Sequence, residues 1–226
     1  QTESFPAFDP STLLEDTGLV LEDQLEGRPL RLRILRYRYT GVTGHHVDVY
    51  FLDPDVEGNA PEDVALGHRL YGGPFGTRIR QEYLLGVCGL RALDLLGLAP
   101  TTYHLNEGHC AFAPIELEAR GWSRTKIAAS VLFTTHTPVP AGHDRFGWDE
   151  VEQVLGPLMP QDVREALSDD ELSMSHLAAF YAGRMNGVSQ LNAEVAHSMF
   201  EGKTIEGITN GVHHITWTSP SMSDLF

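Results

Sequence analysis

The chain has 226 residues, with 16 Lys and Arg against 31 Asp and Glu, so its formal net charge is −15. Apolar residues make up 42% and charged residues 21%, which is ordinary globular usage and excludes a disordered tail, a collagen-like repeat and a disulfide scaffold. The acidic balance excludes a duplex-binding protein, because phosphate contacts need clustered Lys and Arg. We therefore expect no nucleic-acid partner.

Signals for membranes and secretion are missing from the sequence pattern. No run reaches the ~18 uninterrupted apolar residues of a membrane span, and no basic, apolar leader opens the chain. Cys88 and Cys110 stand in apolar stretches without CxxC spacing, so we expect buried free thiols and a cytoplasmic location. The chain opens without Met, and we interpret it as part of a longer protein.

The first 29 residues are acidic and rich in turn formers, and they show no periodicity that predicts an element. Arginine and apolar residues alternate in part over 30–39, before the turn TGVTG. A second strand-like run, HVDVYFL, follows that turn, so a β-hairpin is predicted over 30–52. A loop then leads to a helix start near Pro61, with Asn59 as a candidate cap.

The clearest predicted element is a helix over 78–96, because its apolar residues recur at spacings of three and four and so share one face. Gly97 follows its end. Gly86 and Gly89 lie inside the helix at a cost in helix propensity, which we interpret as close packing against a sheet. The apolar face consists of Ile79, Tyr83, Val87, Leu90 and Leu93.

The middle of the chain predicts a βαβ unit. Strands over 101–105 and 130–135 flank helical residues 110–129, which break once at Gly121. This order implies parallel strands with a right-handed crossover, and therefore an α/β fold. Further helices are predicted near 148–157, 160–167, 175–183 and 188–200, followed by a last strand over 205–209.

Three polar loops that contain histidine follow directly after predicted strands, at 106–109, 136–144 and 210–214. In open α/β sheets the ligand lies outside the carboxyl ends of the parallel strands, so these loops should converge. Carboxylates, imidazoles and amides suit a polyhydroxylated ligand, since each hydroxyl group needs both a donor and an acceptor. The sequence therefore predicts a site for a sugar-like ligand, although a loop histidine with a purely structural role remains the alternative at each position.

A zinc site is the competing interpretation, since nitrogen and oxygen ligands are available in the same loops. The spacing does not support it, because HLNEGH is not the helical HExxH pattern and the first and last of its residues should point to opposite faces of the strand end. LYGGPFGTR also lacks both phosphate-loop patterns, and no GxSxG motif occurs. The zinc candidates are His104, Glu107, His109, His136 and His143, and no metal is expected.

Several longer segments of the chain are distinctive. They are HLNEGHCAF at 104–112, TTHTPVPAGHDRF at 134–146, NGVSQLNAEV at 186–195, ITNGVHHITW at 208–217, LYGGPFGTRIRQEYLLG at 70–86 and VYFLDPDVEGNAPED at 49–63. In their order along the chain they resemble landmarks of the α-glucan phosphorylases, in their shorter bacterial and archaeal branch. The resemblance implies part of the N-terminal catalytic domain of a GT-B enzyme with two Rossmann-like domains, in which 78–220 forms the Rossmann-like part and the C-terminal domain lies outside the chain.

The same resemblance implies an activity and its cofactor. The expected reaction is phosphorolysis of terminal α-1,4-glucosyl units of glycogen, starch or maltodextrin, with α-1,4-glucan and inorganic phosphate as partners and glucose 1-phosphate as product. Pyridoxal 5′-phosphate would be bound by a lysine of the C-terminal domain, because Lys126 and Lys203 match no lysine motif of the family. Two alternatives stay open: a non-catalytic carbohydrate-binding remnant and a sugar-nucleotide-dependent GT-B glycosyltransferase. A homo-oligomer also stays open, and no membrane partner is expected.

The resemblance implies site residues as well. It assigns His136 the catalytic position, against the glucosyl unit at the cleavage point. Pro74 stands where the family usually has an acidic residue, and Asn192 stands where it usually has histidine, so the gate and one helix contact depart from the family pattern. The substrate-binding residues that it implies are Tyr71, Gly72, Asn106, Glu107, His109, Thr137, Asn210 and Gly211.

Overall fold

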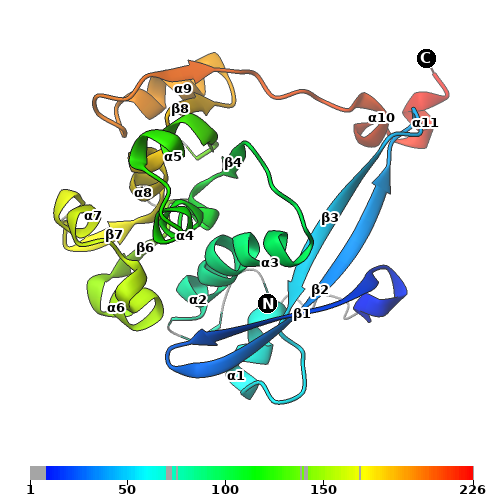
Figure 1. Ribbon diagram of the computed structural model, residues 1–226. Helices are drawn as coiled ribbons and strands as arrows, with labels where there is room; N and C mark the ends of the chain where they lie inside the picture. Colours follow the sequence, from blue (N-terminus) through cyan, green and yellow to red (C-terminus); the bar gives the residue numbers. More distant parts are fainter. Residues whose placement is uncertain are drawn as a thin grey trace.

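Two larger sheets of different type organise the chain, an antiparallel sheet of three strands and a parallel sheet of four strands (Figure 1). One contiguous cluster of buried apolar side chains joins them, from Leu25 and Leu32 of the first sheet to Phe133 of the second. The computed structural model describes residues 9–69, 73, 74, 76–137, 139, 142–167 and 169–225.

The antiparallel sheet confirms the predicted hairpin and adds a strand to it. Its strands, in the order β1-β2-β3, are β1 (Glu15–Leu25), β2 (Arg28–Thr40) and β3 (His46–Asp53), and a short 3-10 turn (Pro10–Thr12) precedes them. The interpretation of the first 29 residues as lacking an element was wrong. Strand β1 lies at the sheet edge and buries only Leu21 and Leu25 fully. Polar residues, Thr17 and Asp23, occupy two of its partly covered positions, so the sequence shows little alternation of apolar and polar residues.

The connection after β3 contains α1 (Pro61–Val64) and a 3-10 turn (Ala65–Gly67). Pro61 begins the helix as predicted, but the prediction of Asn59 as its cap was wrong, because Ala60 occupies the N-cap position. The Asn59 amide instead accepts from the N–H of Arg31 and donates to the carbonyl groups of Arg31 and Pro54. Asn59 therefore fixes the loop to strand β2.

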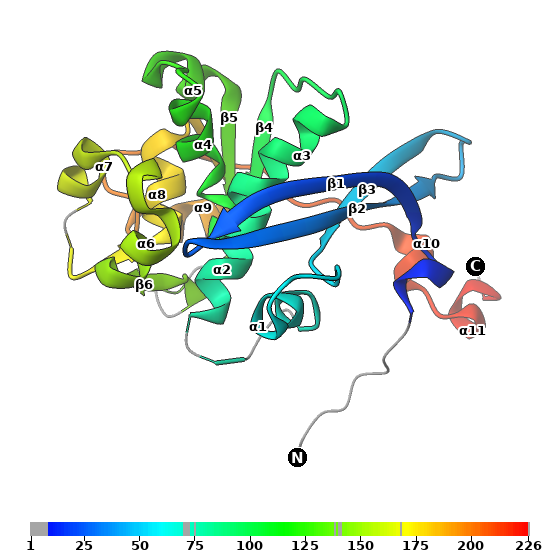
Figure 2. The same ribbon diagram turned by 60° about the horizontal axis from the view of Figure 1, so that its bottom comes forward.

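The predicted long helix is present as α2 (Thr77–Tyr83), a π-helical turn (Leu84–Cys88) and α3 (Gly89–Leu95). A Cβ atom on Gly86 would lie 2.9 Å from the backbone nitrogen of Ala113, whereas Gly89 has no such close neighbour. The close packing is therefore against the start of a helix and not against a sheet. Arg91 of α3 forms ion pairs with Asp23 of β1 and with Glu116. Figure 2 shows α3 lying alongside β1.

The parallel sheet has the order β4-β5-β8-β9, and every neighbouring pair is parallel. It confirms the predicted βαβ unit. The strands are β4 (Tyr103–Asn106), β5 (Val131–Thr135), β8 (Arg184–Gly187) and β9 (Ile205–Gly207), and a 3-10 turn (Gly108–Cys110), α4 (Ala113–Ala119) and α5 (Arg124–Ser130) connect the first two. Strand β8 was not predicted, because its four residues include a single large apolar side chain, Met185.

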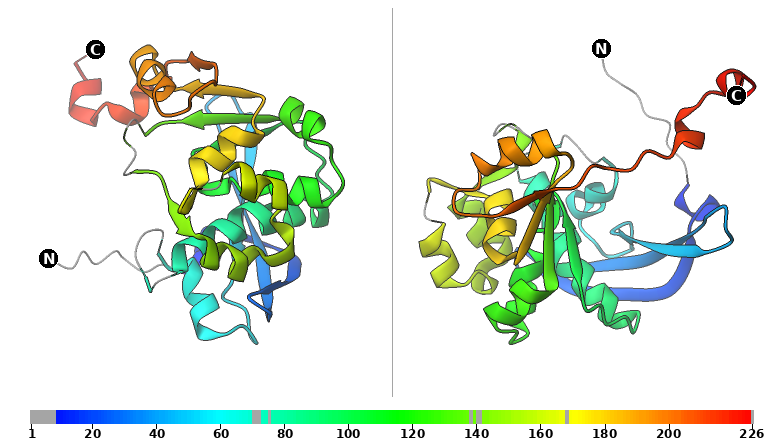
Figure 3. Two further views of the ribbon diagram at one scale, coloured as in Figure 1. Left: turned by 90° about the vertical axis from the view of Figure 1, so that its left-hand side faces the viewer. Right: turned by 90° about the horizontal axis from the view of Figure 1, so that it is seen from above.

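The remaining predicted helices are present, and those over 174–181 and 190–197 pack against the parallel sheet (Figure 3). None of the described helices is long and apolar enough to span a membrane. Both cysteines are free, as expected; Cys88 is buried as expected, whereas Cys110 is only partly buried. These helices are α6 (Trp148–Leu155), α7 (Gln161–Ala166), α8 (Met174–Tyr181) and α9 (Gln190–His197), with a 3-10 turn (Gly156–Leu158) after α6.

Two short strands and two short helices were not predicted. Strands β6 (Arg145–Gly147) and β7 (Glu171–Ser173) form a small antiparallel sheet beside α6. After β9 the chain leads away from the parallel sheet to α10 (His214–Trp217) and α11 (Pro220–Ser223), as Figure 3 shows.

Candidate functional site

The carboxyl ends of the four parallel strands meet at one edge of the sheet, because all four strands run in the same direction. Asn106 ends β4 there and Glu107 follows it, and His136 and Thr137 follow β5. Asn210 follows β9, and its N–H donates to the carbonyl group of Val188 at 3.1 Å. The sheet therefore brings the predicted polar residues of three loops to the same edge.

Glu107 has an uncommon backbone conformation at this edge, with φ 66° and ψ −177°, a region that favours glycine. Its N–H donates to the carbonyl group of Thr134 at 2.9 Å. Its carboxylate Oε1 accepts from the peptide N–H of His136 and, at 2.8 Å, from that of Thr137. The strained residue thus ties the end of β4 to the end of β5.

The main chain of His136 is held from both sides. Its N–H donates to Glu107, and its carbonyl oxygen accepts from Nδ2 of Asn192 at 3.0 Å. Asn192 is buried on α9, and its Oδ1 accepts from the N–H of Val188 at 3.1 Å. Among the described residues the imidazole ring of His136 has no hydrogen-bond partner, so the ring is available to a ligand. The amide at position 192 therefore has a polar role of its own where the family usually has histidine.

His109 is held by a different set of residues. Its Nδ1 atom lies 3.2 Å from Oδ2 of Asp144, 3.6 Å from Oε1 of Glu82 and 2.6 Å from Nη2 of Arg78. The same Nη2 atom lies 3.0 Å from Asp144 and 3.3 Å from Glu82. We call these four residues, Arg78, Glu82, His109 and Asp144, the His109 cluster.

Burial and mutual charge shift the proton equilibria of the His109 cluster. Glu82 is only 1% exposed, and this burial raises its pKa to about 8. The hydrogen bond to Asp144 and the neighbouring carboxyl group of Glu82 raise the pKa of His109 to about 9. Burial acts to raise the pKa of Asp144, but its contacts with His109, Glu82 and Arg78 outweigh it and lower that pKa. At neutral pH His109 is therefore protonated, with Asp144 as its anionic partner.

Oxygen and nitrogen atoms of Glu82, His109 and Asp144 lie within 4.8 Å of one another, a spacing that could hold a metal ion. However, Arg78 Nη2 is within 3.3 Å of all three, so a guanidinium nitrogen already takes the cationic position. The zinc candidates of the sequence do not share a site. His104 bonds to Thr134 (2.6 Å), and His143 is buried against Ser175 (2.5 Å).

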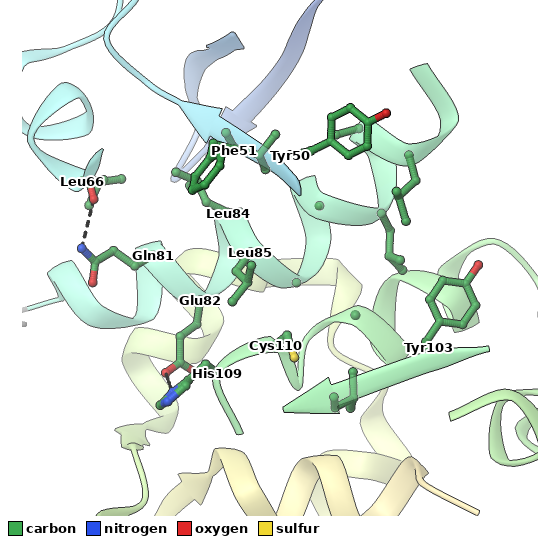
Figure 4. A pocket seen from close by; sticks show the side chains of 18 of the residues that line it. Tyr50, Phe51, Leu66, Gln81, Glu82, Leu84, Leu85, Tyr103, His109 and Cys110 are labelled. Carbon is green, nitrogen blue, oxygen red and sulfur yellow. Dashed lines mark hydrogen bonds and ion pairs between the residues drawn. The ribbon is translucent and has the colours of Figure 1, made fainter. Parts of the chain in front are cut away.

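An apolar groove of about 700 Å³ runs between β3, the α2–α3 helix and β4, and Figure 4 shows it from close by. His109, Glu82 and Arg78 line it, whereas Glu107 and His136 do not. Sequence reasoning placed His109 but missed Glu82. An available signal was the (i, i+4) spacing of Arg78 and Glu82 on the helix.

Some of the other predicted site residues belong to the described part of the chain and some do not. Tyr71 and Gly72 lie outside the described residues, as do the loop prolines Pro138 and Pro140. Asn106, Asn210 and Gly211 are exposed at or beyond the sheet edge. The expected convergence of the whole third loop was wrong, because the chain leads away after Asn210 and carries His213 and His214 to α10 (Figure 3).

Comparisons with known proteins agree with this architecture. The chain is 35% identical to the maltodextrin phosphorylase of Thermococcus litoralis, over 96% of this chain and 29% of that protein. It is 31% identical to the glycogen phosphorylase of Mycobacterium tuberculosis, over 100% of this chain and 31% of that protein. The chain thus spans less than a third of the length of these curated relatives. No protein-family model matches it.

A solved structure is similar in fold. It is the catalytic domain of starch synthase IV from Arabidopsis thaliana bound to ADP and acarbose, with a TM-score of 0.65 and 18% identity. The match covers 92% of this chain and 43% of that chain. At this identity the likeness shows the fold alone, and it confirms the expected α/β fold of the GT-B type.

Proposed function

This chain is related along its whole length to the maltodextrin and glycogen phosphorylases, and on that premise we propose that it forms a sugar-binding part of an α-glucan phosphorylase. In the complete protein the reaction is phosphorolysis of terminal α-1,4-glucosyl units of glycogen, starch or maltodextrin to glucose 1-phosphate. The observation that carries the proposal is His136, whose main chain is held at both ends while its ring is free at the sheet edge.

The residues of this chain act by binding and orienting the sugar. The ring of His136 contacts the reacting glucosyl unit, and contacts that strengthen in the transition state raise turnover. Glu107 and Asn192 hold that histidine in place, so the bound sugar meets a group whose position is already set. Asn106 and Asn210 supply further polar groups at the same edge, and His109 supplies an imidazole beside it.

Pyridoxal 5′-phosphate belongs to the proposal for the complete protein, where it supplies a phosphate group to catalysis. Neither lysine of this chain fits as its anchor. Lys126 stacks on Trp122 of the crossover, with Nζ 3.4 Å from the ring centroid, and Lys203 lies in the turn after α9. A net charge of −15 also leaves few cationic groups for phosphate. We therefore propose that the cofactor and phosphate sites lie outside these 226 residues. We also propose that the complete enzyme is cytoplasmic, in keeping with its free cysteines.

Two measurements test the proposal. The complete protein should release glucose 1-phosphate from maltoheptaose in the presence of phosphate. The 226-residue chain alone should neither do so nor develop Schiff-base absorbance with pyridoxal phosphate, since no fitting lysine is present. Glucose 1-phosphate release by this chain alone would contradict the assignment of the cofactor site.

The unsuitable lysines favour a second description of the 226 residues taken alone, that of a carbohydrate-binding unit without turnover. Maltooligosaccharide binding by the chain, measured calorimetrically, supports this description. A sugar-nucleotide-dependent glycosyltransferase is the remaining alternative, and turnover of a sugar nucleotide in place of phosphate by the complete protein would establish it.

A further inference from the structure

Glu82 is a buried acid to which the proposed reaction gives no role. It lies on α2 beside the buried residues Ile79 and Tyr83, and only 1% of its surface is exposed. Burying a carboxyl group is costly unless other groups compensate. Neither of its carboxyl oxygens has a hydrogen-bond partner among the described residues, and its nearest charged neighbours are the guanidinium group of Arg78 at 3.3 Å and Nδ1 of His109 at 3.6 Å. A buried carboxyl group that faces a half-exposed histidine points to a role in fixing the orientation and protonation of that histidine.

The ring of His109 is held through one of its two nitrogen atoms. In the described part of the chain, every polar contact of the ring involves Nδ1, which faces Asp144, Glu82 and Arg78. His109 also lines the apolar groove, and Figure 4 shows its ring beside the Glu82 carboxyl group. Because the partner of one ring nitrogen decides the orientation and the tautomer, these contacts also determine what Nε2 can do.

We propose that Glu82 is a positioning residue: together with Asp144 and Arg78 it holds Nδ1 of His109, so that Nε2 is a hydrogen-bond donor to a hydroxyl oxygen of the ligand. The identity of that ligand as a glucan rests on the proposed function. The arrangement of the ring does not rest on it.

Of the three possible proton arrangements of the ring, two make Nε2 a donor and the third is disfavoured. When both nitrogens carry protons, Nδ1–H donates to Asp144 and Nε2–H is a donor. When Nδ1 carries no proton, it accepts from Arg78 at 2.6 Å and the remaining proton is on Nε2. In the third arrangement Nδ1 carries the only proton. Its N–H then faces the N–H groups of Arg78, and the neutral ring lacks the positive charge that strengthens the bond to Asp144. This arrangement is therefore disfavoured.

Other titratable groups near the pair do not alter this assignment. Cys110, in the turn that follows β4, lies in the same groove, and burial raises the pKa of its thiol to about 11, so it is uncharged at neutral pH. Arg78 comes from α2, and Asp144 comes from the loop before β6. The titratable or charged groups that face Nδ1 are therefore Arg78, Glu82 and Asp144.

The test uses the complete protein and three variants, Glu82→Gln, Glu82→Ala and the control Glu116→Gln. Glu116 is also a buried glutamate, but it pairs with Arg91 and Arg120 and does not touch His109. The first readout is the rate of carbethoxylation of His109 against pH, followed by peptide mass spectrometry. It needs no ligand, so it decides the role of Glu82 even if the protein binds no glucan.

In this readout the His109 midpoint should fall by about one unit in Glu82→Gln and Glu82→Ala, since both remove a carboxyl group that is ionised at pH values near that midpoint. It should stay unchanged in Glu116→Gln. The second readout is the Kd for maltoheptaose, which should rise about two- to tenfold in Glu82→Ala and recover in Glu82→Gln, because the amide still holds the ring. Wild-type midpoints in both Glu82 variants overturn the proposal. So does a Kd that is the same in Glu82→Ala and Glu116→Gln.

Discussion

Two histidines follow neighbouring parallel strands, and carboxylates hold both of them, but at different parts of the residue. Glu107 binds the peptide N–H of His136 and leaves its ring free. Asp144 and Glu82 instead lie against ring atom Nδ1 of His109. The first arrangement fixes where an imidazole stands, and the second also sets which ring nitrogen carries a proton. A carboxylate next to a histidine therefore has to be assigned to the main chain or to the ring before it is given a role.

The largest effect that this comparison predicts is the loss of kcat when the ring of His136 is removed. His136→Ala in the complete protein should lower kcat by about 10²-fold or more, which corresponds to about 3 kcal/mol. The melting temperature should change little, because the ring has no hydrogen-bond partner among the described residues. Steady-state phosphorolysis of maltoheptaose and thermal melting measure the two quantities.

His143→Ala is the matched control, since this ring is buried and bonded. It lies 2.5 Å from Oγ of Ser175 and 3.1 Å from the carbonyl oxygen of Thr137. Its removal should lower the melting temperature and leave kcat, measured well below melting, much closer to that of the wild type. Equal losses of kcat in the His136 and His143 variants would mean that His136 is not at the sugar site.

The next largest effect concerns the carboxylate that holds a main chain. Glu107→Ala and Glu107→Gly both remove the acceptor for the N–H groups of His136 and Thr137, so both should lower kcat by about tenfold. The glycine variant should be more stable than the alanine variant by about 1 kcal/mol, because φ 66° with ψ −177° suits glycine. Urea unfolding measures the difference. Equal stabilities of the two variants would show that position 107 is not strained.

The contacts between the His109 ring and Glu82 predict that the free energy of unfolding depends on pH. The folded-state pKa values of Glu82 and His109 are raised to about 8 and about 9, so the folded protein binds protons that the unfolded chain releases. Their contribution is fully present below the unfolded values, near 4.5 for Glu82 and 6.5 for His109, and is lost as the pH rises through about 8 and about 9. Each group contributes a slope of at most about 1.4 kcal/mol per pH unit.

Chemical denaturation between pH 5 and pH 9 measures this slope. Glu82→Gln should flatten the part between pH 5 and pH 8, because an amide does not titrate. Glu116→Gln should leave that part unchanged. A Glu82→Gln curve as steep as that of the wild type would show that another group dominates the slope.

The smallest expected effect comes from the second contact of the His136 main chain. Asn192→Asp keeps the acceptor for the N–H of Val188 but replaces the donor to the His136 carbonyl group. Loss of one hydrogen bond should lower kcat by about two- to tenfold, since such a bond contributes about 0.5–1.5 kcal/mol. A kcat measurement on this variant checks it, with Asn192→His as the comparison that restores the residue usual in the family.

The sequence by itself determined the elements whose pattern is local. The helix through Ile79, Tyr83 and Val87 follows from spacings of three and four, which need no information from distant residues. The β4–β5 pair follows from a short crossover, because its handedness restricts the strands to one parallel arrangement. Motif resemblance then located Glu107, His109 and His136, but not what holds each of them.

Only the tertiary structure decided the partners. Asn192 reaches the His136 carbonyl group across 56 residues, and Asp144 reaches His109 across 35. Glu82 was missed because a carboxyl group on a helix reads as solvent-exposed unless the packing around it is known. Strand β1 was missed because edge strands bury few side chains. Periodicity reports which face of an element is buried, whereas contacts between elements depend on how those faces pack, and the order of residues does not record this.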